Sequence, residues 1–199
     1  MTSKAIRSWG DFLNPDVTRP RLIAASVFIA GFEALKESIV GRIRSFFWTG
    51  FDESGDKLDP KYESDVLSRN KSPVYASLEW LKERGAVDDQ DLAAFGRVKT
   101  CRNTLAHELL SALGSEGLPP DFEERLKEML EMLKKIEVWW IANVEIPTDP
   151  DLDGAENNED GITTGPVVVL QLLVEIALGE PERSYVYYQE FCRRTNSGN

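Results

Sequence analysis

Apolar residues recur every three or four positions along most of this chain, which is the spacing of one buried helix face. The first such stretch covers residues 21–47, where Gly31 is small enough to let another helix approach closely, and a shorter one covers residues 74–84. Gly85 then stands where a helix often ends in a left-handed glycine. The pattern predicts two helices. Residues 48–72, between them, have no sustained period and are expected to form a long loop with at most a short helical turn.

A third helix has a clear start signal in the sequence. Asp88 can cap its first turn, Asp91 stands three residues later, and the apolar stripe continues to Leu113. Asp121 can cap a fourth helix, whose apolar face continues to about Val144. The sequence therefore predicts an all-α protein, an up-and-down bundle of four to five main helices with a long first helix and an additional C-terminal helical segment.

The stretches around this bundle differ from it in composition. Residues 1–20 contain two prolines and are expected to form an irregular N-terminal arm. Residues 147–165 are strongly acidic and almost empty of core residues, which indicates a linker or an exposed loop. The chain is thus expected to divide into the arm, the helical bundle over residues 21–146, the acidic linker and the C-terminal segment over residues 166–194.

The C-terminal segment has two parts. Residues 167–178 are apolar nearly all round, which fits a core helix, a buried strand or an oligomer contact. The second part gathers aromatic side chains beside an arginine, namely Tyr185, Tyr187, Tyr188, Phe191 and Arg193. Such a cluster can stack on single-stranded bases, but packing against the bundle is the more common use and is expected here.

Composition restricts the function. With 199 residues, 42% of them hydrophobic, the chain is expected to fold as one soluble domain. Its net charge of −11 argues against a broad electropositive surface for duplex DNA, so any contact with nucleic acid must be local. Cys101 and Cys192 lie far apart and no secretory segment is present, which favours a cytoplasmic protein without disulfides. No apolar run is long enough to span a membrane, so no membrane partner is expected.

The candidate chemistry lies in a charged patch of the third helix, residues 99–109, which contains the chain's single histidine, His107. Asn103 precedes His107 by four positions, so the two side chains share one helix face. Arg102 precedes His107 by five positions, which places it about 140° around the helix axis. The arginine can approach the histidine by its own reach, through a local bend, or from a second copy packed antiparallel across a two-fold axis. The last arrangement predicts a homodimer with a composite cleft.

This set of residues fits the cleavage of RNA. Histidine has an unperturbed pKa of about 6.5 and can take and give a proton near neutral pH. Arginine presents a planar donor fork that matches phosphate oxygens. In a reaction that needs no metal or other cofactor, the 2′-hydroxyl attacks the phosphate, His107 handles the proton and Arg102 stabilises the anionic transition state, while Asn103 orients His107 or donates to phosphate. DNA lacks this internal nucleophile.

Further charged residues are candidates for supporting the site. Glu33 or Glu37 on the first helix is expected to hold Arg102 in a bidentate contact, although surface charge in water is the default for such residues. Lys99 is a second supporting candidate. The predicted substrate-binding cations are Arg97, Lys99, Arg69 and Lys71. The last two stand in the expected loop, where scattered cations usually just face water.

The segment Arg102-Asn103-Thr104-Leu105-Ala106-His107 resembles the signature of HEPN domains (higher eukaryotes and prokaryotes nucleotide-binding), an arginine, a polar residue, a spacer and a histidine. The resemblance covers these six residues strictly and is supported by the helical layout over residues 21–145. It implies a helical bundle, often dimeric, with Arg102 and His107 as catalytic pair and Asn103 as polar partner. Many members of the family are metal-independent RNases of toxin–antitoxin pairs, antiviral defence or RNA processing. The resemblance therefore implies such an activity here, with an antitoxin or regulatory protein as an additional partner.

Two interpretations from other functional classes stay open. One is a noncatalytic helical interaction module, in which Arg102 and His107 make structural hydrogen bonds and the acidic surface binds a basic partner. The other is a nucleotide-binding regulatory domain, in which Arg102 holds a phosphate without cleavage. The HEPN family includes both kinds of member, and the charge of −11 favours a specific RNA target or a partner protein over general RNA degradation.

Overall fold

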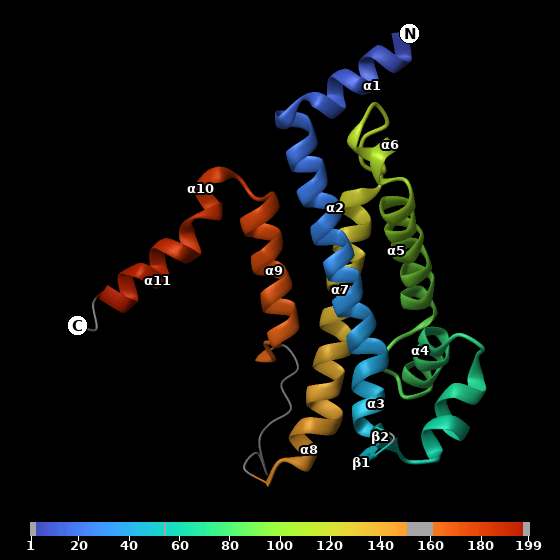
Figure 1. The fold of residues 1–199 in the computed structure, drawn as a ribbon. Coiled ribbons are helices and arrows are strands. Elements are labelled where there is room, and N and C mark those ends of the chain that lie inside the picture. The colour runs from blue at the N-terminus through green and yellow to red at the C-terminus, as the bar shows by residue number, and fades with distance from the viewer. Residues whose placement is uncertain (1–2, 54, 151–160, 197–199) are drawn as a thin grey trace.

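The computed structural model of the chain describes residues 3–53, 55–150 and 161–196. The fold is all-α, as predicted, with one small two-stranded sheet in the described residues. Two long helices, α2 (Pro15–Lys36) and α7 (Phe122–Trp140), pack against each other at the centre. The helix α5 (Asp89–His107) covers this pair on one side and α9 (Gly165–Leu178) covers it on the other (Figure 1).

The core lies where these four helices and α4 (Pro73–Glu83) meet. Gly31 on α2 allows the close approach that its size suggests, because a Cβ there would lie 2.6 Å from Cε of Met129 and 3.2 Å from the Leu170 methyl carbons. The largest fully buried side chains come from α2, its continuation, α4, α5 and α7, and include Phe28, Leu35, Trp80, Phe95, Leu105, Leu133 and Ile136. Because α5 contributes to this core along its length, the direction of its remaining side chains is fixed.

The N-terminal residues form helices, and the expected irregular arm is wrong. A first helix, α1, covers Ser3–Leu13, and α2 begins at Pro15. Asn14 caps α2 by accepting a hydrogen bond from the N–H of Asp16 (3.0 Å). Pro15 occupies the first helical turn, where its fixed φ is favourable and its missing N–H costs nothing. Pro15 therefore starts the helix, and Pro20 lies inside α2 without ending it.

The first long helix continues beyond α2 without leaving its axis. A π-helical turn at Glu37–Gly41 leads into α3 (Arg42–Phe46). The end of α3 at Phe46 agrees with the predicted end of the first helix at residue 47. The following residues are more regular than the predicted loop. Strands β1 (Trp48–Asp52) and β2 (Gly55–Leu58) pair antiparallel, and short π- and 3₁₀-helical turns follow at Tyr62–Val66 and Leu67–Arg69.

The glycines of the hairpin explain why periodicity missed it. Gly50 and Gly55 have φ values of 144° and 117°, a backbone conformation that other residues rarely adopt. Two strands of five and four residues are too short for an alternating pattern to stand out. Tyr62 and Val66 are buried, so this stretch is tied to the core.

The predicted second helix is confirmed as α4, and Gly85 after it has the expected positive φ of 73°. The fourth helix is confirmed as α7, which continues through a π-helical turn at Ile141–Glu145 into the short α8 (Ile146–Thr148). Asp121 precedes α7 without making the expected side-chain cap; its carboxylate pairs with Arg125 at 3.4 Å. The acidic stretch over residues 151–160 lies outside the described residues.

The C-terminal segment is helical throughout but only partly packed. The helix α9 buries Val167 and Leu170 against α2 and α7. After the short α10 (Pro181–Ser184), α11 (Val186–Asn196) leads away from the bundle (Figure 1). Its aromatic residues are exposed, so the expected packing of this cluster on the bundle is wrong. None of the described helices is long and apolar enough to cross a membrane.

Candidate functional site

The start of α5 is built by the predicted capping box. The Asp88 side chain accepts hydrogen bonds from the N–H groups of Gln90 (2.8 Å) and Asp91 (3.1 Å), and the Asp91 carboxylate accepts one from the N–H of Asp88 (2.8 Å). Lys135 on α7 donates to both carboxylates. These hydrogen bonds, from Lys135 first, lower the pKa of Asp88 below its usual value. The helix carrying the motif is therefore fixed to α7 at its N-terminal end.

The buried face of α5 decides where the motif residues point. Phe95, Val98, Cys101 and Leu105 lie in the core, and the helix is regular up to His107. Arg102, Asn103 and Thr104 therefore lie half-buried around the helix, while Ala106 and His107 face solvent. Asn103 and His107 share a side of the helix, as their spacing requires.

Arg102 is held at the contact between α5 and α2. Its Nη2 donates to Oε1 of Glu33 at 3.0 Å, and its guanidinium carbon lies 5.6 Å from the centre of the Phe32 ring. Its Nε is buried and has no hydrogen-bond partner among the described residues. Partial burial opposes ionisation of Glu33, but hydrogen bonds from Lys36 and Arg102 outweigh this and lower its pKa. The expected contact from Glu33 to Arg102 is present, through one nitrogen and not as a bidentate fork.

Glu37, the other expected partner of Arg102, lies elsewhere. It belongs to the π-helical turn after α2 and lines a pocket of about 230 Å³ with Arg44, Trp48 and Asp56 at the hairpin. The extra residue of a π-helical turn rotates the positions after it relative to a regular helix. Glu33 stands before that turn and meets α5, whereas Glu37 does not.

His107 is the last residue of α5, and the predicted continuation of this helix to Leu113 is wrong. Glu108 interrupts it with φ −116° and ψ 25°, and a separate short helix, α6, covers Leu109–Leu113. The bend comes after the motif, so it does not bring Arg102 closer to His107. His107 is exposed, and its side chain makes no hydrogen bond or ion pair with the described part of the chain. Within one copy, the two residues therefore point to different sides of α5.

The end of α6, which follows the interruption at Glu108, is held by a residue of α2. Arg21 donates Nη1 hydrogen bonds to the carbonyl oxygens of Leu113 (3.2 Å) and Gly114, and so holds the end of α6. Next to the break, a pocket of about 330 Å³ is lined by Thr104, Glu108, Ser111, Ala112 and the loop that follows, residues 116–120. The carboxylates of Glu108 and Glu116 make this pocket acidic, which disfavours an RNA phosphate inside it.

The predicted substrate-binding cations do not gather around the motif. Arg97 pairs with Glu128 on α7 (2.6 Å), and Lys99 lies 4.7 Å from the centre of the Tyr75 ring. Arg69 pairs with Glu83 on α4, and Lys71 is exposed in the turn before that helix. Hydrogen bonding to Glu128 also raises the pKa of Arg97. The structure thus brings Arg102 and Glu33 together, places Arg97, Lys99 and Arg69 in separate contacts, and leaves Lys71 exposed.

Two features were missed by sequence reasoning. Arg42 in α3 donates Nε to Oε1 of Glu137 (3.0 Å) and pairs through its other nitrogens with Glu137 and Glu145. Glu137 is only 1% exposed and also accepts a hydrogen bond from Ser38 (2.6 Å). A glutamate at an inward position of the fourth helix was the available signal, because such a residue needs a cation nearby.

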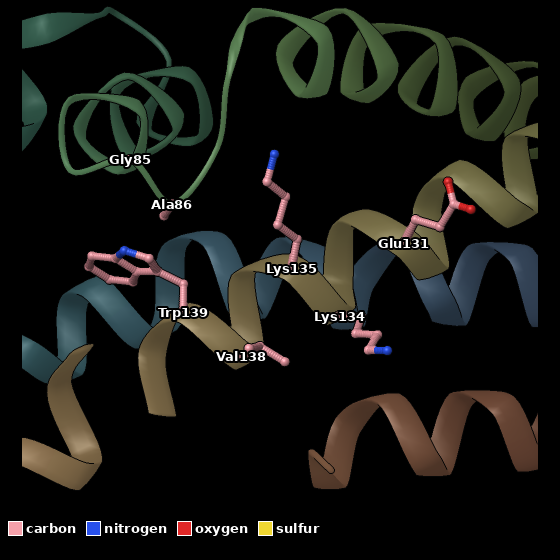
Figure 2. Close-up of a pocket in the computed structure, with 7 residues that line it drawn as sticks. All are labelled: Gly85, Ala86, Glu131, Lys134, Lys135, Val138 and Trp139. Atoms are coloured by element: carbon pink, nitrogen blue, oxygen red, sulfur yellow. The ribbon is translucent and has the colours of Figure 1, made fainter. Parts of the chain in front are cut away.

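The second missed feature is a pocket of about 410 Å³ between α7 and the α4–α5 connection. Figure 2 shows the Trp139 ring beside Ala86 and Lys135 extending from α7 toward α5, while Lys134 points to the other side of α7. The Lys135 ammonium is already paired with Asp88 and Asp91 (3.0 and 2.5 Å). The pocket is thus linked to the capping box and is separate from the motif.

Neither cysteine forms a disulfide in the described structure. Burial, followed by the nearby charge of Asp121, raises the pKa of Cys101 to about 11. Its sulfur therefore stays a thiol at neutral pH, and Cys101 acts as a core residue of α5 and not as a nucleophile.

No protein-family model, curated protein or solved structure matches this chain. The residues of α5, with their six-residue resemblance to the HEPN signature, are therefore the features that point to a function.

Proposed function

We propose that this protein is a metal-independent endoribonuclease of HEPN type, whose cleft combines Arg102 of one copy with His107 of another. His107 takes the proton of the RNA 2′-hydroxyl as its oxygen bonds to phosphorus. The bond from phosphorus to the 5′ oxygen breaks, and that oxygen takes up a proton from water. Arg102 stabilises the extra negative charge on the phosphoryl oxygens. The products are a 2′,3′-cyclic phosphate and a 5′-hydroxyl end.

The proposal is based on the exposure and the contacts of the His107 and Arg102 side chains. His107 faces solvent at the end of α5, and its imidazole takes no part in the described side-chain hydrogen bonds. Arg102 is 28% exposed and held by a single carboxylate contact, so a phosphate can compete with Glu33 for the guanidinium. An exposed histidine and a preoriented arginine on one helix fit a phosphate-cleaving pair better than they fit a purely structural role.

The need for a second copy follows from the geometry of α5. The helix is regular through the motif, so the separation of about 140° between Arg102 and His107 remains. A two-fold axis between two antiparallel α5 helices places each arginine beside the other copy's histidine. With a chain charge of −11, we expect a specific RNA, or a partner protein that supplies positive charge, as in toxin or antiviral effectors.

A noncatalytic interaction or nucleotide-binding module is the second candidate. The Arg102–Glu33 contact favours it, because an arginine that only ties α5 to α2 would make the same contact. The two candidates differ in what His107 does, since only the nuclease needs its proton transfer.

The test compares purified wild type, Arg102→Ala, His107→Ala and Lys127→Ala on structured RNA in EDTA. Lys127 is an exposed α7 cation and serves as the matched control. We expect cleavage by wild type and by the control, and losses of about 100-fold or more in the two motif variants. Mixing the two inactive variants should restore about a quarter of the activity, because half of the dimers are mixed and each holds one intact composite site. Wild type that leaves RNA intact, or motif variants that cleave like wild type, would refute catalysis.

A further inference from the structure

The outer side of α9 is an uncovered apolar stripe. While Val167 and Leu170 face the bundle, Val169, Leu173 and Ile176 point outward and are 45 to 57% exposed. Their spacing of four and three residues places them on one face of the helix. A soluble chain that leaves a continuous aliphatic face open usually covers it with another molecule.

The helix α11 is a second uncovered surface next to the first. It follows α10 and leads away from the bundle, so that α9 and α11 form an open V (Figure 1). The exposed large side chains around it are Tyr185, Val186, Tyr187, Tyr188 and Phe191. The hydroxyl of Tyr187 donates to Glu175 on α9, which fixes α11 to α9. A helix of 11 residues is marginal alone in water, so its order calls for a surface against which it packs.

We propose that the surface formed by α9, α10 and α11, the C-terminal arm, binds a second copy of this chain, with α11 of each copy lying along the outer stripe of the other copy's α9. Both surfaces are present once in every copy and stand next to each other, so one two-fold axis covers all four helices at once. The inference does not depend on the proposed nuclease activity.

The exposed area is of the size that a stable dimer needs. The eight exposed apolar side chains of α9, the α10–α11 junction and α11 are between 41 and 66% exposed. Together they offer on the order of 800 Å² per copy, which is the usual contribution of each partner to a specific interface. A single-stranded RNA would use only the aromatic part of this surface, because Val169, Leu173 and Ile176 have no ring on which a base can stack.

Charge does not oppose contact with a second copy. Residues 165–196 carry Arg183, Arg193 and Arg194 against Glu175, Glu180, Glu182 and Glu190, a net charge of −1, whereas the whole chain has a net charge of −11. The part of the chain that meets its own copy is therefore nearly neutral, so repulsion between like charges at this contact is small.

The surface is separate from the motif helix. The α2–α7 pair lies between α9 and α5, so a contact through α9 and α11 does not bring the α5 helices of two copies together (Figure 1). A result that refutes the contact through α9 and α11 is therefore distinguishable from one that refutes the nuclease, since each proposal is tested with its own variants and its own measurement.

The first experiment measures mass by sedimentation equilibrium of the full chain for wild type, Leu173→Ser, Phe191→Ser and Leu110→Ser. Leu110 is a leucine on α6 that is even more exposed than Leu173 (74% against 45%) and lies far along the chain from α9 and α11, so it is the control. We expect self-association of wild type and of the control, with dissociation constants at least tenfold higher in the two arm variants. Circular dichroism and the melting temperature verify that both variants remain folded.

The second experiment tests the geometry by cross-linking. In a Cys192→Ser background, copies carrying Leu173→Cys are mixed with copies carrying Phe191→Cys and oxidised; Cys101 is buried and stays unreactive. We expect a disulfide-linked dimer of unlike copies. Wild type that stays monomeric at about 100 µM overturns the proposal, and so does self-association that both arm variants retain in full. If monomeric wild type binds oligouridine and Phe191→Ser does not, the arm is a base-stacking surface instead.

Discussion

The ion pair between Arg42 and Glu137 makes the sharpest prediction about stability. Glu137 is 1% exposed and accepts hydrogen bonds from Ser38 and from two nitrogens of Arg42. Burial opposes the charge on Arg42, but its hydrogen bonds to Glu137 and Glu145 outweigh this and raise its pKa. In Arg42→Ala the carboxylate stays buried with Ser38 as its remaining partner.

The expected loss follows from this geometry. Breaking a buried pair by removing one partner costs roughly 3–5 kcal/mol. The Arg42 side chain is 30% exposed, so water reaches part of the site after its removal, and we expect the lower end of that range, about 3 kcal/mol. Glu137→Gln keeps the shape and a hydrogen-bonding oxygen, so it should cost about 1–3 kcal/mol.

The assay is urea unfolding followed by circular dichroism, with the slope of the free energy against urea compared between variants. Lys127→Ala, which breaks an exposed pair with Glu131 (3.8 Å), is the control and should change stability by less than about 0.5 kcal/mol. An Arg42→Ala protein within about 0.5 kcal/mol of wild type, at unchanged slope, would refute the argument that this buried carboxylate depends on the guanidinium.

Two further predictions concern the packing and pH response of the bundle. Gly31→Ala brings a Cβ within 2.6 Å of Cε of Met129 and 3.2 Å of the Leu170 methyl carbons, flexible ends that must shift inside the core, so the gain of alanine in helix propensity is offset and the fold should be destabilised in urea by about 1 kcal/mol at most, whereas Gly96→Ala, in open space on α5, should be neutral or stabilising. Asp88 has a lowered pKa in the folded protein, so its contribution to stability is present above the unfolded-state pKa of about 3.9 and is lost as pH falls through the lower folded value. Asp88→Asn should flatten this acid dependence in unfolding curves measured between about pH 2 and 5, and an unchanged pH profile would contradict the role of the capping box.

Local signals predicted the parts of the structure that depend on nearby residues. The capping box of Asp88 and Asp91 needs only four consecutive positions and a backbone turn, and it forms as expected. The pair of Glu33 and Arg102 was predictable as one of two alternatives, because two amphipathic helices in contact place their flanking charges at the interface. Periodicity alone could not choose between Glu33 and Glu37, because the π-helical turn that separates them in space has no clear sequence signal.

The end of α5 shows why other features could not be predicted. Leu105, Leu109 and Leu113 continue the apolar stripe across Glu108, and glutamate and leucine are good helix formers. The interruption is instead accompanied by Arg21, far away in the sequence, which holds the carbonyl oxygens of Leu113 and Gly114. A tertiary contact of this kind overrides local propensity, and the same applies to the burial of Glu137 under Arg42.

The two proposals together determine what kind of assembly would be active. The motif needs a partner on the α5 side of the α2–α7 pair, whereas the arm needs one on the α9 side, so a dimer through either side leaves the other uncovered. Two different two-fold contacts on opposite sides of one copy close into a tetramer when their axes are perpendicular. Leu173→Ser should then reduce the mass to a dimer that keeps its nuclease activity. If the same substitution leaves a folded monomer without nuclease activity, the contact through α9 and α11 must be what orders the α5 pair. The two faces are then coupled through α2 and α7.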